Sequence, residues 1–456
     1  MTKTFTKQFA IVIFLILFSF LCGFISGKGE YFNYILHTYL EKNDKVQVDS
    51  GFTQILKENG IKPELLNEAY DIISKNYYSF SNTPKSDLIS GMIKGLVTSL
   101  GDKHSEYFNL DETKKFNETL SGDFEGIGAV IQKSDFGVIV ERLIAGAPAK
   151  EAGILSGDII IKANDIELKN LSLFDAVNKI KGPAGTIVSL DIIRPGEKEI
   201  IKKEVIRKKI NIPSVDSKVL DKNIGYVMLS IFGEKTGDEF KTALSELQSK
   251  NINSLIIDLR DNGGGYLETA VSILSNFVEK DKVLVTTKEK NPLNNKSYFS
   301  YGNANKKIPI IILVNGNSAS ASEITAGALK DYNIALIVGE KTYGKGSVQE
   351  PFILSDGSEM KITIAKWFTP LDHGIDGIGI NPDIEVKFIK EDYEKNFDRQ
   401  LDEAKKIMSK LLETKNIKTT IDFYNNLKKE EEAKKLGDIT SSGTSLTGTT
   451  TETKTK

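Results

Sequence analysis

Ser320, in the run NGNSASASE, is the first residue whose type and position could support acyl-transfer chemistry. It follows an apolar run and opens an amphipathic one. A strand-to-helix turn projects a side-chain hydroxyl, and the helix N-terminus favours developing negative charge. The same position also suits an N-cap serine, which is the commonest role of serine there. Ser320 is therefore a candidate nucleophile whose alternative role is a helix cap.

Lys345, in GEKTYGKGSVQ, follows the apolar run 334–340 and lies between two glycines. The run nearly matches a phosphate-binding loop, because four residues separate Gly339 from the Gly344–Lys345 pair. Gly346, however, stands where that loop has the Ser or Thr that holds magnesium, and a strand is expected next instead of a helix. We exclude nucleotide binding, so Lys345 is either a solvated surface lysine or a catalytic base.

A glycine turn, DLRDNGGG at residues 258–265, closes another expected strand. Glycines let backbone N–H groups approach a ligand without interference from a Cβ atom. The turn can form an oxyanion hole, or it can be a tight strand–helix connection. Both interpretations remain open at this point.

Composition excludes several classes of function. The chain has 60 Lys and Arg against 62 Asp and Glu, and this balance predicts no nucleic-acid partner. Cys22 is the only cysteine, so neither an intrachain disulfide nor a thiolate metal cluster can form. The chain has only three histidines, so we expect no metal site and no cofactor. The chemistry must come from Ser, Lys, carboxylates and the backbone.

The N-terminus predicts export and a membrane anchor. Residues 9–25 carry no charge and follow Lys3 and Lys7, and their length gives a helix of about 25 Å, the short end of a membrane span. The basic end favours a cytoplasmic tail with the rest of the chain outside the cytoplasm, periplasmic or extracellular. A cleaved signal peptide is the alternative, but no A-x-A-like site follows. Lipidation of Cys22 is disfavoured by the bulky residues before it.

The texture of the sequence then predicts an α/β protein of several parts. Two apolar strands each followed by an amphipathic helix indicate parallel βαβ units in the C-terminal half. Short β-type runs separated by glycine precede them, and the final residues lack apolar periodicity. The expected parts are a cytoplasmic tail (1–8), an anchor (9–27), a helical region (28–120), a β-rich domain (121–208), an α/β core (209–390), a charged helical region (391–436) and a disordered tail (437–456).

The succession of DLR-x-N-x-GG, SASASE, GKGSVQ and GIGINPD resembles the C-terminal processing peptidases, also called tail-specific proteases. The resemblance runs over residues 86–386 and includes GDKHSEYF. It implies a crotonase- or ClpP-like core with a parallel sheet and helices. By position in the motifs it implies Ser320 as nucleophile, Lys345 as its base and Gln349 as third member.

The resemblance also implies an oxyanion hole made by the backbone N–H groups of Ala321 and Gly264. This chain departs from the family pattern, which usually reads Asn-Asn-Pro-Gly-Gly where residues 261–265 read DNGGG. Glycine in place of proline loosens the turn. A lysine at its ordinary pKa of about 10.4 is protonated at neutral pH, and burial lowers that pKa. A Gln orients the amine without adding charge.

Residues 121–208 resemble a PDZ domain, through GDFEGIGAVI, AGILSGDIIIKAND and LSLFDAVNKI. PDZ domains bind an extended peptide C-terminus by strand addition and hold its carboxylate with loop N–H groups. Here that loop is Gly126, Ile127 and Gly128. The chain is thus expected to be an extracytoplasmic serine endopeptidase that recognises protein C-termini and cleaves through an acyl-enzyme.

Three alternatives differ in class. The first is an inactive scaffold that only binds C-termini, and the intact Ser320, Lys345 and Gln349 argue against it. The second is a Ser–His–Asp hydrolase that uses His104 or His373. The third is a crotonase-like acyl transferase, which the exported location disfavours. The expected partners are substrates with free C-termini, and a homodimer and an activating protein are both left open.

Overall fold

The computed structural model describes residues 60, 62, 64–144, 146–302, 308–395 and 397–443. The chain divides into two units, residues 1–89 and 90–456. The first unit contains α4 (Glu64–Asn76), which buries none of its residues, a 3-10 turn (Phe80–Asn82) and the start of α5 (Lys85–Thr98). The expected anchor at 9–25 lies outside the described residues. None of the helices in the described ranges combines the length and apolar character that crossing a membrane requires.

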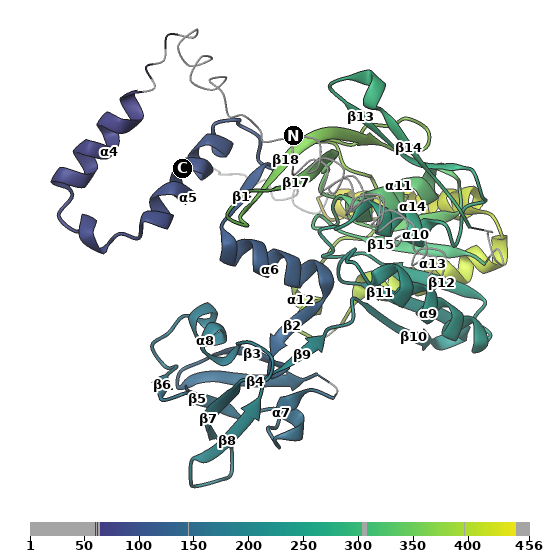
Figure 1. The fold of residues 1–456 in the computed structure, drawn as a ribbon. Helices are drawn as coiled ribbons and strands as arrows, with labels where there is room; N and C mark the ends of the chain where they lie inside the picture. The colour runs from purple at the N-terminus through teal and green to yellow at the C-terminus, as the bar shows by residue number, and fades with distance from the viewer. Residues whose placement is uncertain are drawn as a thin grey trace, which may run out of the picture. The chain divides into compact units, whose positions relative to one another are not determined.

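A six-stranded sheet forms the centre of the second unit (Figure 1). All neighbouring strands are parallel except the first pair, which confirms the expected parallel α/β core. Strands made of unbroken Ile, Leu and Val runs suit a sheet buried on both faces. The order is β10 (Val215–Leu220), β11 (Ile224–Leu229), β12 (Ser254–Asp258), β15 (Ile310–Val314), β16 (Ala335–Gly339) and β19 (Ile384–Glu385).

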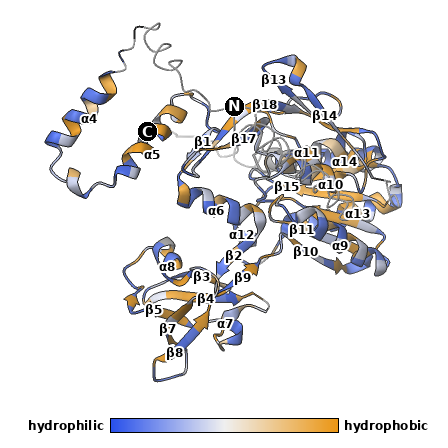
Figure 2. Cartoon of the chain, in the orientation of Figure 1, coloured by the Kyte–Doolittle hydropathy of each residue, from blue (hydrophilic) through white to orange (hydrophobic). Residues whose placement is uncertain are grey.

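Helices cover both faces of this sheet, and Figure 2 shows hydrophobic residues along its strands. Alternation along a strand divides the core, since Ile312 packs in one cluster and its neighbour Ile311 in the other. The first cluster includes residues of α9 (Thr236–Ser249), α10 (Leu267–Leu274) and α11 (Ala321–Asp331). The second includes residues of α13 (Arg399–Thr414) and is flanked by α14 (Ile417–Gly443).

α14 continues to Gly443, beyond residue 436, where the sequence predicted the helical region to end. Residues 437–443 were expected to be disordered, and this expectation is wrong. Adding a residue to an existing helix costs far less than starting one, so weak helix formers can extend a helix that begins upstream. The rest of the tail lies outside the described residues.

A second, antiparallel sheet of five strands lies in the same unit and was not predicted. Its strand β1 lies at 106–108, inside the region expected to be helical, so that prediction is wrong there. The motif EYF is too short to show a strand period, and it forms a strand by pairing with β18. The strands are β1 (Glu106–Phe108), β13 (Val283–Glu289), β14 (Lys296–Phe299), β17 (Ser347–Ile353) and β18 (Glu359–Phe368).

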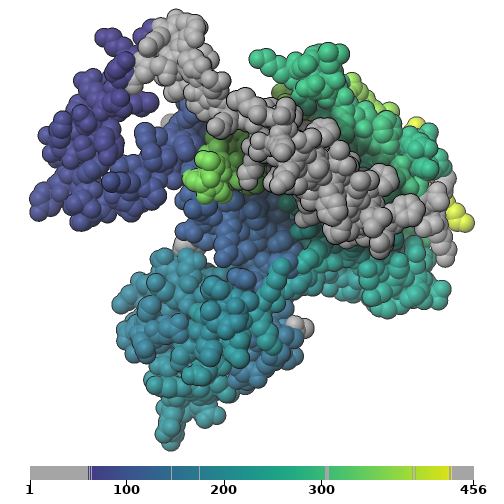
Figure 3. All heavy atoms as spheres, in the orientation of Figure 1, coloured from purple at the N-terminus to yellow at the C-terminus, as the bar shows by residue number. Residues whose placement is uncertain are grey.

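The β-rich domain has its own sheet and its own hydrophobic core, and Figure 3 shows its residues as one packed body in blue and teal. Strand β3 is the terminal strand of the sheet and pairs only with β4. The elements are β3 (Ala129–Ser134), β4 (Gly137–Leu143), α7 (Pro148–Glu151), β5 (Ile159–Ala163), β6 (Ile166–Glu167), α8 (Leu173–Ile180), β7 (Ile187–Ile193) and β8 (Ile201–Ile206).

A two-stranded ribbon connects this domain to the rest of the unit. β2 (Asp123–Gly126) pairs with β9 (Lys208–Asn211). α6 (Leu110–Ser121) precedes the ribbon and has a complete capping box between Asn109 and Glu112. The short α12 (Lys390–Tyr393) precedes α13.

Candidate active site

Ser320 occupies the turn between β15 and α11 and is the N-cap residue of α11. Its backbone has φ 54° and ψ −116°, a region that residues other than glycine rarely adopt. Such strain persists only where the surroundings hold it, and it is concentrated at functional sites. The partly buried Ser320 is therefore fixed in an unusual conformation at a helix N-terminus, as a projecting nucleophile requires.

The glycine turn is in close contact with Ser320. A Cβ atom at Gly264, which has φ 102°, would lie 2.7 Å from the Ser320 Cβ and 3.0 Å from the Ala321 nitrogen. The Gly264 N–H donates to the side-chain oxygen of Asn262 at 2.9 Å. The Ala321 N–H forms no hydrogen bond to any described residue. Of the two predicted oxyanion-hole donors, the Gly264 N–H is already hydrogen-bonded, and the Ala321 N–H has no partner within the described chain.

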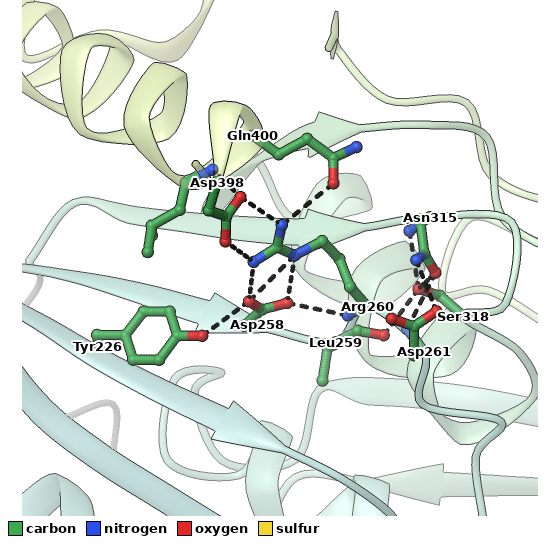
Figure 4. A network of polar contacts seen from close by, with 10 residues as sticks. Tyr226, Asp258, Leu259, Arg260, Asp261, Asn315, Ser318, Asp398 and Gln400 are labelled. Carbon is green, nitrogen blue, oxygen red and sulfur yellow. Dashed lines mark hydrogen bonds and ion pairs between the residues drawn. The ribbon is translucent and has the colours of Figure 1, made fainter. Parts of the chain in front are cut away.

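Side chains on both sides of the turn fix its backbone (Figure 4). Asp261 accepts hydrogen bonds from the side-chain amides of Asn315 and Asn317 at 2.9 and 2.8 Å. The Ser318 hydroxyl donates to the Leu259 carbonyl at 2.7 Å. These bonds tie the residues just before Ser320 to the glycine turn, so the two segments are held as one unit.

Arg260 anchors the other side of the turn, in a network that the sequence analysis missed. Its guanidinium binds Asp258 at 2.6 Å and Asp398, the N-cap residue of α13, at 2.7 Å (Figure 4). Burial opposes the charged form, but hydrogen bonds to the two carboxylates raise the pKa of Arg260. Tyr226 donates to Asp258 at 2.8 Å. The charged residues of DLR, at the end of a buried strand, were the available signal.

Lys345 lies in the loop after β16, and its side chain is partly buried. Burial lowers the pKa of its amine, and the positive charge of Lys361 lowers it further. The charges of Glu106, Asp102 and Glu323 act in the opposite direction but do not reverse the shift. Within the described residues the amine forms no hydrogen bond or ion pair. A desolvated lysine without a carboxylate partner is the form that can accept a proton.

The GIGINPD run is hydrogen-bonded to the loop that carries Lys345. The Gly377 N–H donates to the Gly344 carbonyl at 2.9 Å, and the Ile380 N–H donates to the Thr342 hydroxyl at 2.7 Å. A Cβ atom at Gly344, which has φ 88°, would lie 2.8 Å from the Gly379 nitrogen. This close contact explains why there is a glycine in each segment, Gly344 in the lysine loop and Gly379 in the GIGINPD run.

One carboxylate brings the two candidate catalytic segments together. The N–H groups of Ser320 and Lys345 both donate to the same oxygen, Oε2 of Glu323, each at 2.9 Å. Glu323 is the last residue of the SASASE motif, which by itself predicts no role for it beyond the helix cap. The two backbone nitrogens are therefore within twice that distance of each other.

Gln349 does not bind Lys345 in this structure. Its side-chain amide donates to the hydroxyls of Ser347 at 2.8 Å and Thr363 at 3.1 Å. The β17–β18 register shifts between Val348 and Gln349, so the residue lies at a bulge. Its role as third member stays a prediction.

The two histidines of the alternative mechanism lie in different places. His373 is exposed, and its Nδ1 lies 3.4 Å from Asp331. Asp331 ends α11, whereas Ser320 begins it, which separates them by about 15 Å along the helix. His104 packs edge-on against Tyr343, with 6.4 Å between ring centroids. Burial and the charge of Lys345 lower the pKa of His104. Because His373 lies at the end of α11 away from Ser320, His104 is the histidine left for the alternative mechanism.

An apolar groove lies in the β-rich domain where the sequence predicted capture of a C-terminus. Its volume is about 210 Å³, and Gly126, Ile127 and Gly128 form part of its lining. The predicted loop begins one residue later than expected, because Gly126 is the last residue of β2 and pairs with Lys208 of β9. Val177 and Ile180 of α8 and Ile131 of the edge strand β3 also line the groove. Lys181 supplies a positive charge at the groove. No group of His, Cys, Asp and Glu within the described residues could hold a metal ion.

Comparisons with known proteins agree with this architecture. Residues 223–386 match the model for peptidase family S41, 139–194 match a PDZ domain, and 24–113 match the activating protease CtpB N-terminal domain. The carboxy-terminal processing protease CtpB of Bacillus subtilis is 37% identical over 325 residues, covering 71% of this chain and 67% of the relative. CtpA of the same organism is 36% identical over 327 residues, covering 72% and 69%.

The family models match the core and the domain that carries the groove, and the relatives align across about two thirds of their own length. The resemblance seen in the motifs is thereby confirmed. The chain belongs to the carboxy-terminal processing proteases, serine-type peptidases of family S41 that carry a PDZ domain.

Proposed function

We propose that the chain is an endopeptidase in which Lys345 is the general base for Ser320 and Gln349 orients the lysine. The observation that carries the proposal is the single Glu323 oxygen that accepts the backbone N–H groups of both Ser320 and Lys345. The lowered pKa of the Lys345 amine supports it, because only the neutral amine can take a proton.

The reaction follows from these roles. Ser320 Oγ bonds to the scissile carbonyl carbon while its proton passes to Lys345 Nζ. Collapse of the tetrahedral intermediate breaks the C–N bond, and the proton on Lys345 goes to the leaving amine. Water then attacks the Ser320 ester and loses a proton to Lys345. Collapse of this second intermediate breaks the ester C–O bond, and Lys345 returns the proton to Ser320 Oγ, which restores the hydroxyl and the neutral amine; the carboxylic acid product loses its own proton to solvent.

The oxyanion of each tetrahedral intermediate needs backbone donors. The Ala321 N–H and the Gly264 N–H are proposed for this role, and a donor of this kind contributes about 3–4 kcal/mol in comparable sites. The Gly264 N–H must either leave the Asn262 side chain or bind both oxygens. Release or sharing of this hydrogen bond is thus part of the proposal.

The PDZ groove is proposed to select substrates by their free C-termini. Edge strand β3 has an open side for an added peptide strand, and the loop Gly126–Gly128 provides N–H groups for the terminal carboxylate. The apolar lining of the groove favours an apolar last residue. A docked tail is held near the enzyme, which raises the effective concentration of the substrate to about the millimolar range.

A pair of peptides tests the proposal. One peptide with an apolar last residue is prepared as the free acid and as the C-terminal amide, and cleavage rates are measured with the intact chain. The free acid should be cleaved faster, and Ser320→Ala should cleave neither. Equal rates on both peptides would refute carboxylate capture, and cleavage by Ser320→Ala would refute the nucleophile. An inactive scaffold would leave both peptides uncut.

We further propose that the chain acts outside the cytoplasm, tethered by residues 9–25. The basic residues before this uncharged run support the orientation. The full-length protein, expressed in bacteria, should remain in the membrane fraction after an alkaline wash, and external protease should degrade it in spheroplasts. A mature N-terminus beginning near residue 24 or 28 would contradict the uncleaved anchor.

A further inference from the structure

Glu323 is a buried carboxylate that the proposed reaction does not use directly. It is the third residue of α11, and none of its surface is exposed. Among the described residues it has no ion pair with Lys, Arg or His. An ionised carboxylate taken out of water costs several kcal/mol unless hydrogen bonds replace the solvent. A residue that bears this cost requires a physical reason for its charge.

Four donors surround the carboxylate and fill its capacity. Oε2 accepts the N–H groups of Ser320 and Lys345, each at 2.9 Å. Oε1 accepts the Gly344 N–H at 2.7 Å and the Thr342 hydroxyl at 2.5 Å. An ionised carboxylate has about four acceptor positions and no donor, so every position is in use. Charge-assisted bonds of this kind are about twice as strong as neutral ones.

The donors come from two segments that the chain order keeps apart. Ser320 belongs to the turn before α11, whereas Thr342, Gly344 and Lys345 belong to the loop after β16. The bond from the Ser320 N–H to Glu323 is the usual contact between the N-cap and N3 residues of a capping box. Here the same carboxylate also binds the lysine loop, so Glu323 and its four donors form a clamp between two loops. The other three bonds hold the lysine loop to the same group.

We propose that Glu323 is the positioning residue that sets the separation of the Ser320 and Lys345 backbones and holds Ser320 in its strained conformation. The proposal rests on the proposed Ser–Lys function and adds a residue to it. Proton transfer between two side chains is sensitive to their separation, and a misplacement of about 1 Å can cost about a hundredfold in rate.

The negative charge of Glu323 favours the protonated form of Lys345, which cannot act as a base. A positioning role for Glu323 can therefore be distinguished from an electrostatic one. Its negative charge raises the pKa of Lys345, as do Glu106 and Asp102, while burial and Lys361 lower it, and His104 also lies near the amine. Removing the charge must therefore lower the pKa of Lys345. If electrostatics governed the role, neutralising Glu323 would help the base.

Glu323→Gln separates these effects because it keeps the shape and removes the charge. The amide NH₂ is a donor and cannot accept from a backbone N–H group. Facing Ser320 and Lys345 it loses both of their bonds, and facing the other arm it loses the Gly344 bond, while the Thr342 hydroxyl can still accept from it. We expect kcat on a tailed peptide to fall about a hundredfold, while KM, which is proposed to depend on the PDZ groove, stays within about twofold. The acidic limb of the kcat/KM pH profile should move to lower pH.

Glu112→Gln is the matched control. Glu112 closes the capping box of α6 through the same N3-to-N-cap bond, at 3.0 Å, but accepts from no catalytic segment. It should leave kcat, KM and the pH profile unchanged. A kcat of Glu323→Gln equal to that of the parent, with Lys345→Ala inactive, would overturn the proposal. Activity retained in Lys345→Ala would instead refute the Ser–Lys function on which it rests.

Thr342→Val is the second variant, used if Glu323→Gln does not fold by circular dichroism. It keeps the carboxylate and removes one of its donors. We expect kcat to fall about tenfold with no shift of the acidic limb, because the charge on Glu323 remains. An unchanged kcat in this variant would overturn the proposal as well.

Discussion

The surroundings of the Lys345 amine suit it to the proposed role of a base. An exposed lysine is protonated at neutral pH, and this one is shifted toward the neutral form by burial and by Lys361. A base acts when deprotonated, so activity should rise as the pH rises through the pKa of Lys345. A lowered pKa brings that rise closer to neutral pH.

Lys361→Met tests the contribution of the neighbouring charge. Lys361 lies on β18, where it pairs with Glu106 at 3.0 Å and its amine lies over the ring of Phe108. Removing its positive charge raises the pKa of Lys345, so the acidic limb of the kcat/KM profile should move to higher pH. This direction is opposite to that expected for Glu323→Gln.

Lys288→Met is the control for that measurement. Lys288 is also a lysine with an ion pair, to Asp372, and a phenylalanine ring, Phe368, beneath its amine. Its removal should leave the pH profile unchanged. A profile for Lys361→Met that coincides with the parent, or that moves to lower pH, would contradict the account of the lysine.

Gly264→Ala tests the contact between the glycine turn and the nucleophile. The added methyl group would lie 2.7 Å from the Ser320 Cβ, and φ 102° is unfavourable for alanine. We expect kcat to fall at least a hundredfold while the PDZ domain still binds a free-acid peptide, measured by fluorescence anisotropy. Gly263→Ala, where a Cβ meets nothing within 4 Å, is the control and should cost far less. Equal activities of the two variants would contradict this role for Gly264.

The catalytic roles of Ser320, Lys345 and Gln349 came from the family resemblance of short motifs and stay predictions. Ser320 and Lys345 were predicted to act together, and their backbones do meet at one carboxylate. The clamp itself was not predictable, because Glu323 in SASASE is indistinguishable from an ordinary capping-box glutamate. Only the tertiary fold brings the loop after β16 within its reach.

At the scale of elements, α13 is fastened to the strand that leads into the glycine turn. Asp398 both caps α13, through the Leu401 N–H, and binds Arg260. Burial opposes ionisation of Asp398, but the hydrogen bond from Arg260 holds its pKa below the ordinary value. A carboxyl group whose pKa falls on folding stabilises the folded state above its unfolded pKa, and that stability is lost as the pH falls.

Asp398→Ala should therefore lower the free energy of unfolding by about 1–3 kcal/mol at pH 7, from the lost cap and the partly screened ion pair. The difference from the parent should shrink as the pH falls below about 4, the range of an ordinary Asp. Urea unfolding at several pH values measures both effects. Asp402→Ala, which removes a pair with Lys406 on the same helix, should cost less than about 1 kcal/mol. A constant difference at all pH values would contradict the linkage.

The α8 wall of the groove makes an element-scale prediction for specificity. Val177 lines the groove, and Val177→Asp places a negative charge where the substrate carboxylate and its last side chain are expected. KM for a free-acid tailed peptide should rise at least tenfold, with kcat unchanged, since the charge acts on binding. Asn178→Asp adds the same charge on the exposed side of α8 and should have little effect. Equal KM values for the two variants would contradict the assignment of the groove.

At the scale of elements, a strand could be predicted where its own residues show the pattern, and could not where it forms only by pairing with a distant strand. The parallel core could be predicted, because long Ile- and Val-rich runs such as 310–314 fold as buried strands wherever they lie. The five-stranded sheet could not, since β1 and β18 are far apart in sequence and neither shows that it has a partner. Tertiary pairing of this kind overrides local propensity.

In the whole molecule, the proposed recognition groove and the proposed catalytic site are built on separate hydrophobic cores. The PDZ core and the two clusters around the central sheet share no residue, and the β2–β9 ribbon connects the domains. A groove variant should therefore change substrate binding, whereas a clamp variant should change turnover. This division makes KM and kcat separate reports on the two parts.

The most direct test of the central claim is a double-mutant comparison of Ser320 and Lys345. Rates on the free-acid peptide are measured for Ser320→Ala, Lys345→Ala, the double variant and His104→Ala. Residues that act as one catalytic unit are strongly non-additive, so the double variant should be scarcely slower than either single one. His104→Ala should keep most of its activity. Substantial activity in Lys345→Ala, together with its loss in His104→Ala, would contradict the Ser–Lys mechanism and assign the base to His104.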